Sequence, residues 1–277
     1  MPKRVLTKQR TQFRENLKPA IEGAINSMKI FNKYIRELLK LRIKRVDEFD
    51  PPQMPAEASN EERQLIEECG KFSMTGPVRM WALVQAMKHV QRHGIQGDFV
   101  ECGVWKGGNL ALLDKFSKMI GLERKVYGFD TFSGMPEPDN VDIDLFGNSA
   151  KETMQNEVKD ETVSNIHAFA TIEQVRNNLK NLNIRDVNLI QGNVEDTLAK
   201  HQNIPDQIAI LRLDTDWYSS TKVELKTLYP LLQSGGVLII DDYGHYEGAK
   251  KAVDEYFNSN SLWMHYVDYT CRLIIKP

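Results

Sequence analysis

The chain has few cysteines and no long apolar run. Its three cysteines, Cys69, Cys102 and Cys271, cannot all pair with one another and lack the spacing of a metal site, so we expect reduced thiols. No apolar stretch approaches the roughly 18 residues that a membrane span needs. The first ten residues, MPKRVLTKQR, have the charge of a signal peptide, but no apolar core follows them. These absences predict a protein that stays in the cytoplasm.

Charge is spread unevenly along the 277 residues. Residues 1–46 contain 13 Lys and Arg but three acids, a net charge of +10, so the remaining residues have a net charge of −12. Apolar side chains recur every three or four residues within 17–46, which predicts an amphipathic helix. The proline-rich stretch 49–62 predicts a linker. The predicted organisation is therefore a basic helical extension over 1–60 and one domain over 61–277.

The basic extension allows two interpretations. A helix of this charge could bind a membrane surface or a polyanion. It could also pack against acidic residues of its own chain or of a second copy, which we favour because the rest of the chain has the opposite charge. We therefore predict a homo-oligomer formed through N-terminal helices, without a nucleic-acid partner.

Residues 61–277 predict an α/β domain. Short apolar runs alternate with helical stretches, the pattern of a parallel sheet covered on both faces. The last 15 residues before Pro277 predict two strands around a turn at 268–270, and the polar stretch 134–170 predicts an active-site lid or a disordered loop. The predicted strands are 98–102, 125–129, 187–191, 208–213 and 236–241, and the predicted helices are 62–70, 77–93, 108–119, 171–183, 219–233 and 246–258.

The first three strands end in residues suited to an adenosine. The first runs into ECGVWKGGN, where Glu101 would repel a phosphate but suit a sulfonium or ammonium group. Asp130 ends the second strand, where an acid can accept hydrogen bonds from ribose, and Glu195 and Asp196 follow the third. An ordinary Gly-rich turn and helix caps would explain each feature alone. Together they favour S-adenosylmethionine over NAD, whose GxGxxG motif is missing.

The next two strands end in paired carboxylates. Asp214 and Asp216 follow the fourth strand, and Asp241 and Asp242 follow the fifth. Neighbouring strands would bring the two pairs together, and the carboxylates would then raise one another's pKa unless a cation joined them. Mg²⁺ prefers such oxygen ligands. One acid of each pair, Asp216 or Asp242, could instead cap a helix, but two pairs favour a metal site.

Seven sequence blocks resemble the TylF/MycF macrocin-type sugar O-methyltransferases, and they cover most of the chain from 73 to 276. The blocks are SMTGPVRM (73–80), GDFVECGVWKGGN (97–109), YGFDTFSGMPEP (127–138), VEDTL (194–198), LRLDTDWYSSTKVEL (211–225), YPLLQSGGVLIIDDYGHYEGAKKAVDEYF (229–257) and VDYTCRLIIK (267–276). Two positions depart from the usual pattern: Cys271 replaces a glycine and Val194 an aromatic residue.

The resemblance implies a Rossmann-like class I methyltransferase: a mostly parallel seven-stranded sheet with a terminal antiparallel strand, helices on both faces and extra N-terminal helices. It implies that Asp214, Asp241 and Asp242 bind Mg²⁺ and that Asp216, or the metal ligand Asp214, is the general base. The implied contacts of S-adenosylmethionine are Thr75, Arg79, Glu101, Gly103, Gly107, Gly108, Asn109, Asp130, Thr131, Ser133, Asn193, Val194, Glu195 and Asp196.

The implied activity is Mg²⁺-dependent methylation of one hydroxyl of a vicinal diol, on a sugar or a sugar-bearing natural product. A catechol-type O-methyltransferase would use the same metal chemistry on a planar diol. A non-catalytic protein that docks on a membrane or partner through its basic helix is the alternative from another class.

Overall fold

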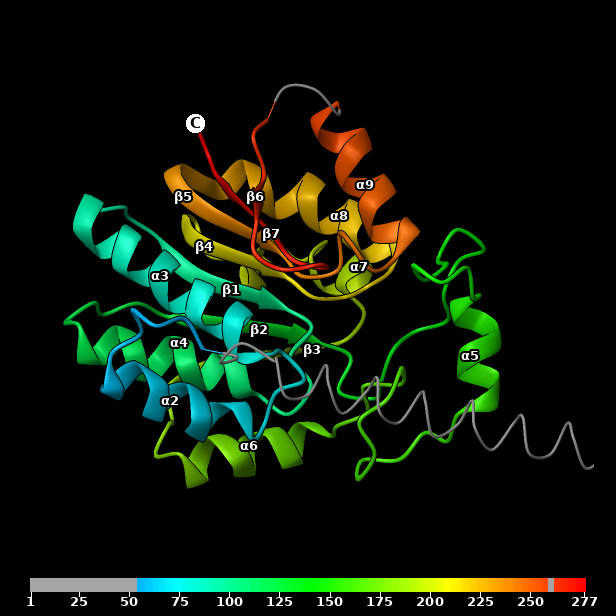
Figure 1. Cartoon of the computed structure of the whole chain (residues 1–277), viewed down its shortest axis with the longest axis horizontal. Coiled ribbons are helices and arrows are strands. Elements are labelled where there is room, and N and C mark those ends of the chain that lie inside the picture. Colours follow the sequence, from blue (N-terminus) through cyan, green and yellow to red (C-terminus); the bar gives the residue numbers. More distant parts are fainter. Residues whose placement is uncertain (1–53, 259–261) are drawn as a thin grey trace, which may run out of the picture. The chain divides into compact units, whose positions relative to one another are not determined.

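The computed structural model describes residues 54–258 and 262–277. The predicted helix over 17–46, and with it the predicted oligomer contact, lies outside these residues. The described part contains a seven-stranded sheet of order β3-β2-β1-β4-β5-β7-β6 (Figure 1). Its strands are β1 (Asp98–Cys102), β2 (Val126–Asp130), β3 (Val187–Gln191), β4 (Ile208–Leu213), β5 (Leu232–Ile240), β6 (His265–Tyr266) and β7 (Arg272–Ile275).

The sheet is parallel except at its C-terminal edge. Strands β1 to β5 pair in parallel, β7 runs antiparallel to β5, and β6 runs antiparallel to β7. This confirms the predicted parallel sheet and its terminal antiparallel pair. Strand order reverses direction between β1 and β4, and a ligand in an open α/β sheet binds beside such a switch point.

Helices cover both faces of the sheet (Figure 1). One face bears α2 (Asn60–Gly70), α3 (Pro77–His93), α4 (Gly108–Met119) and α6 (Ile172–Asn181), and the other bears α7 (Val194–Thr197), α8 (Tyr218–Leu228) and α9 (Glu247–Phe257). Phe99 and Val100 of β1 are both fully buried and belong to different apolar clusters, because neighbouring residues of a strand point to opposite faces. Among the described helices, none is long and apolar enough to cross a membrane.

Most predicted elements are confirmed, but the helix predicted over 219–233 is too long. Helix α8 ends at Leu228, a short 3₁₀ turn follows at Tyr229–Leu231, and β5 begins at Leu232. Pro230 lacks the N–H that a continuing helix needs. Strand β5 also begins earlier than the predicted 236, where Gly235 and Gly236 interrupt the apolar pattern that marks a strand in the sequence.

The stretch 134–170 forms turns and one helix, α5 (Ala150–Asn156). Asp142 within it is 1% exposed. Its carboxylate accepts a hydrogen bond from the backbone N–H of Tyr218 (2.9 Å) and from that of Asp139 (2.7 Å). The stretch is therefore fastened to the first turn of α8.

Candidate functional site

A cavity of about 490 Å³ lies at the carboxyl ends of the five parallel strands. Its lining includes one residue at or just after the end of each of these strands: Gly103, Asp130, Gly192, Asp214 and Asp241. Residues of the stretch 134–170 complete the wall. This is the place where open α/β sheets bind ligands, and the volume is typical of small-molecule sites.

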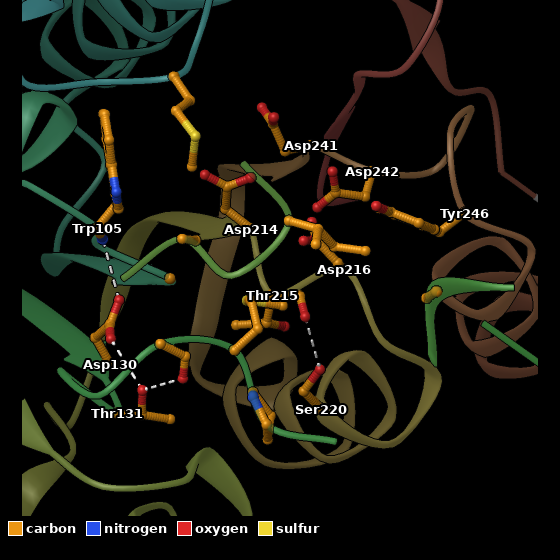
Figure 2. A pocket seen from close by; sticks show the side chains of 18 of the residues that line it. Trp105, Asp130, Thr131, Asp214, Thr215, Asp216, Ser220, Asp241, Asp242 and Tyr246 are labelled. Atoms are coloured by element: carbon orange, nitrogen blue, oxygen red, sulfur yellow. Dashed lines mark hydrogen bonds between the residues drawn. The ribbon is translucent and has the colours of Figure 1, made fainter. Parts of the chain in front are cut away.

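The turn after β1 is held by Asp130. One carboxylate oxygen of Asp130 accepts hydrogen bonds from the backbone N–H of Val104 (2.7 Å) and Trp105 (3.0 Å) (Figure 2). Burial raises the pKa of Asp130, and these N–H groups oppose that effect. Gly103, with φ +84°, has no room for a side chain, because a Cβ would lie 1.9 Å from the carbonyl oxygen of Asp214. This end of the cavity is thus shaped by backbone.

Three carboxyl groups gather on the cavity lining. Oxygen atoms of Asp214, Asp216 and Asp242 all lie within 4.8 Å of one another (Figure 2). Burial, together with neighbouring carboxylates, raises the pKa of Asp214 and Asp242 well above the usual range and that of Asp216 to about 7. Asp216 has φ +63°, a conformation uncommon for residues other than glycine and frequent at functional sites. Such a set of oxygen atoms fits Mg²⁺.

Asp241 lies beside this cluster and is engaged by two arginines. Its carboxylate pairs with Arg79 and with Arg212, the latter at 2.8 Å. Burial alone would raise the pKa of Asp241, but these guanidinium groups hold it below the ordinary value. The structure therefore groups Asp216, in place of the predicted ligand Asp241, with Asp214 and Asp242.

The helix-cap interpretation of the acids is wrong. Helix α8 is preceded by Trp217, and its first N–H bonds to Asp142 rather than to Asp216. Helix α9 is preceded by Tyr246, four residues after Asp242. Neither strand-end acid is needed as a cap, which leaves their carboxyl groups available to a ligand.

Twelve of the predicted site residues line the cavity. They are Thr75, Arg79, Gly103, Asp130, Thr131, Asn193, Val194, Glu195, Asp214, Asp216, Asp241 and Asp242. These residues come from strand ends far apart in the sequence, and the fold brings them to one cavity. Whether they bind donor or metal stays a prediction.

Six predicted donor contacts do not line the cavity: Glu101, Gly107, Gly108, Asn109, Ser133 and Asp196. Glu101 is buried against Arg212 (2.7 Å), and the amide of Asn109 donates to Thr75 (2.9 Å). A Cβ at Gly108 would lie 2.6 Å from the carbonyl oxygen of Cys69, so this glycine allows helix packing. Gly107 has φ +92° and packs against Val175. Ser133 and Asp196 are exposed.

Sequence reasoning missed several residues of the site. Glu224 is fully buried, its carboxyl group 3.0 and 3.1 Å from the hydroxyl of Thr215, and burial raises its pKa to about 8. Arg212 is buried in a strand and pairs with three carboxylates. For Arg212, the signal available was a charged residue inside a predicted buried strand.

An aromatic wall, which we define as Tyr246, His245 and Tyr269, also lines the cavity. The ring centroids of His245 lie 4.6 Å from Tyr246 and 5.9 Å from Tyr269. The hydroxyl of Tyr246 points toward Asp216 and Asp242 (Figure 2). A Cβ at Gly244 would lie 1.9 Å from the carbonyl oxygen of Tyr269, so this glycine permits the close approach of the two segments.

Comparison with known proteins identifies similar enzymes. Residues 11–274 match the family described as Macrocin-O-methyltransferase (TylF). Demethyldecarbamoylnovobiocin O-methyltransferase of Streptomyces niveus is 33% identical over 187 residues, 66% of this chain and 67% of the relative. The 8-demethyl-8-(2,3-dimethoxy-alpha-L-rhamnosyl)-tetracenomycin-C 4'-O-methyltransferase of Streptomyces olivaceus has the same identity and coverage. The solved structure of the O-methyltransferase NovP has a TM-score of 0.66 and 25% identity, covering 79% of this chain and 99% of that chain.

Proposed function

We propose, because this chain belongs to the macrocin O-methyltransferase (TylF) family, that it transfers the methyl group of S-adenosylmethionine to a sugar hydroxyl with the help of Mg²⁺. Family membership makes the chain an O-methyltransferase that acts on sugar or natural-product substrates. The observation that carries the finer proposal is the carboxyl cluster of Asp214, Asp216 and Asp242 in a cavity whose other end suits an adenosine.

The donor would occupy the end of the cavity near Asp130 and the residues that follow β3. Glycine turns there permit close approach of the backbone, and Thr131, Asn193 and Glu195 line the same end. These side chains offer hydrogen-bond acceptors for ribose and adenine. The free end of the donor, with its reactive methyl group, would then face the carboxyl cluster.

Mg²⁺ would be held by Asp214 and Asp242, the two residues shared by the resemblance and by the carboxyl cluster. Asp241 is proposed as the third ligand, held ready by the pairings with Arg79 and Arg212. When bound, the cation supplies Lewis-acid chemistry that acidifies an alcohol. Asp216 is proposed to accept the hydroxyl proton, because its carboxyl group lies in the same cluster and is not one of the three proposed metal ligands.

The acceptor would lie between the carboxyl cluster and the aromatic wall. Sugar rings present C–H faces that pack on aromatic rings and hydroxyl edges that bond to carboxylates. The name of the Streptomyces olivaceus relative specifies a rhamnosyl group, which favours a sugar over a catechol. A vicinal diol would bring two oxygen atoms to the same cluster.

The test measures methyl transfer from S-adenosylmethionine to methyl α-L-rhamnopyranoside, with Mg²⁺ and with EDTA. We expect transfer only with Mg²⁺, and we expect Asp216→Asn to lower kcat by about 10²–10⁴ while S-adenosylhomocysteine still binds. Asp160→Asn, which changes a half-buried acid of the stretch 134–170 that does not line the cavity, is the matched control. Full activity of Asp216→Asn would move the base to another residue, and transfer to catechol alone would favour the planar-diol alternative.

A further inference from the structure

Arg212 is a buried cation in the central strand of the sheet. It belongs to β4, all six residues of which are buried, and it is 1% exposed. A charge in such a position is costly unless it is fully paired. Both terminal nitrogen atoms of the Arg212 guanidinium group, Nη1 and Nη2, are paired.

Each arm of Arg212 bonds to two residues that differ in their predicted roles. Nη1 bonds to Glu101 (2.7 Å) and to Asp214 (2.7 Å). Nη2 bonds to the hydroxyl of Thr75 (2.9 Å) and to Asp241 (2.8 Å). Glu101 and Thr75 are predicted donor contacts, whereas Asp214 and Asp241 are predicted metal ligands, so each arm holds one residue of each kind.

The sheet imposes this arrangement. Arg212 is directly opposite Glu101 on β1 and Ile239 on β5. Asp214 and Asp241 each follow by two residues and therefore point to the same side as their strand neighbours. The guanidinium group is planar and rigid, so the distance between its arms fixes the distance between Asp214 and Asp241.

The acids around Arg212 outnumber the guanidinium groups that pair with them, which favours binding of a further cation. Arg212 faces three carboxylates, and Asp241 is the one also paired with Arg79. Glu101 Oε2 is buried without a hydrogen-bond partner. Without Arg212 these buried carboxylates would repel one another. Their spacing would no longer be set by a hydrogen-bond donor that they share.

We propose that Arg212 is a positioning residue that links two predicted donor contacts, Glu101 and Thr75, to two proposed metal ligands, Asp214 and Asp241. This inference rests on the proposed function. Arg212 holds Asp214 and Asp241 in a fixed relation to each other and ties both to Glu101 and Thr75. Binding of the methyl donor therefore strengthens binding of Mg²⁺, and binding of Mg²⁺ strengthens binding of the donor.

The experiment titrates full-length protein with Mg²⁺ alone, with S-adenosylhomocysteine alone, and with each in the presence of the other. In the wild type we expect saturating Mg²⁺ to tighten S-adenosylhomocysteine binding at least about fivefold, the lower end of typical couplings between sites. In Arg212→Lys we expect each ligand to bind about tenfold more weakly and the mutual effect to fall below about twofold. Lysine keeps the charge but offers one ammonium that cannot span both arms.

Arg272→Lys is the matched control. Arg272 also lies in a strand, donates to two backbone carbonyl groups and does not line the cavity. Its replacement should leave both affinities and their mutual effect unchanged, with thermal unfolding recorded for both variants. Equal loss of the mutual effect in Arg272→Lys would overturn the proposal, because the effect would then follow general destabilisation of the sheet.

Thr75→Ala keeps the proposal testable if Arg212→Lys does not fold. It removes the predicted donor contact that accepts from Nη2 without removing a carboxylate, and we expect Mg²⁺ to bind about three- to fivefold more weakly, with Thr75→Ser restoring the affinity. Wild-type Mg²⁺ affinity in Thr75→Ala overturns the inference. If wild-type protein binds no Mg²⁺ or no S-adenosylhomocysteine, the proposed function fails; if it binds both independently, the inference alone fails.

Discussion

Glu224 is a buried acid that stays protonated at neutral pH. Burial raises its pKa to about 8, although the hydroxyl of Thr215 opposes that effect, and the charged groups that face it are Glu195 and Asp242. The unfolded chain releases the proton near the ordinary value of 4.5. Between these values the folded state binds more protons than the unfolded state, so the free energy of unfolding falls as pH rises from about 5 to about 8.

Glu224→Gln should remove this pH dependence. An amide has the shape of the protonated carboxyl group and cannot ionise. We expect the Tm of the variant, relative to the wild type, to rise by about 2–4 °C between pH 5.5 and pH 8.5, the shift that roughly 1 kcal/mol produces in a chain of comparable size. Differential scanning calorimetry at the two pH values measures it.

The control is Glu67→Gln, an exposed residue of α2, measured in the same buffers. A relative Tm of Glu224→Gln that stays flat or falls with pH would contradict the assignment of a protonated Glu224. Other buried acids titrate in both proteins and cancel in the comparison.

At the scale of single residues, the sequence predicted which strand-end acids line the cavity, but it did not predict the partner of each acid. Asp214, Asp216, Asp241 and Asp242 were predicted from their positions at strand ends, and all four line the cavity. Glu101 was assigned to the donor, but its partner is a buried arginine. Side-chain pairing across two strands depends on register, and register is not readable from one strand alone.

At the scale of elements, the stretch 134–170 depends on Asp142 for its attachment. The carboxylate of Asp142 bonds to the backbone N–H of Tyr218, and a Cβ at Gly248 would lie 1.8 Å from it. A side chain thus supplies, from 76 residues away, the cap that α8 lacks in its own sequence. Two further bridges, Ile143 to Ser149 and Asp144 to Tyr246, join the stretch to itself and to the aromatic wall.

Asp142→Ala should loosen this stretch. We expect a loss of about 1–2 kcal/mol in the free energy of unfolding, the effect of removing a helix N-cap, with faster proteolysis within 134–170. The KM of the acceptor should rise, while S-adenosylhomocysteine binds as in the wild type. Urea unfolding and limited proteolysis measure the two effects.

Ser149→Ala is the comparison, because Ser149 caps α5 within the same stretch but does not join it to α8. Equal proteolysis of the two variants would mean that Asp142 has no special role in attachment. A weaker affinity for S-adenosylhomocysteine in Asp142→Ala would likewise place its effect at the donor end.

The sequence predicted elements well where a local pattern decides them. Helix α3 has proline at its first position and glycine after its last, and its predicted bounds, 77–93, are confirmed. The predicted strands at 98–102 and 208–213 are also confirmed, because short, mainly apolar runs mark them in the sequence. The stretch 134–170 has no hydrophobic periodicity from which its structure could be predicted. Single contacts, such as that of Asp142 with α8, hold it in place.

At the scale of the whole molecule, we propose a boundary between the two predicted domains that lies before residue 60. Compact contacts divide the chain between Pro52 and Gln53, eight residues before the predicted boundary at 60. Ser59 forms a capping box with Glu62 at the start of α2, and Arg63 bonds to the carbonyl oxygen of Ala58 (3.0 Å). We therefore propose that residues 54–60 belong to the second domain.

Two truncations test this boundary. Residues 53–277 should fold and bind S-adenosylhomocysteine as the full chain does, because the residues that line the described cavity lie between Met74 and Tyr269. Residues 61–277 lose the Ser59 cap and the Ala58 contact, and we expect their free energy of unfolding to fall by about 1–2 kcal/mol below that of 53–277. Urea unfolding compares the pair, and light scattering reports whether self-association, which we propose for residues 1–52, disappears from both.

Loss of donor binding in 53–277 would instead make the basic extension part of the site. Equal stability of the two truncations would return the boundary to residue 60.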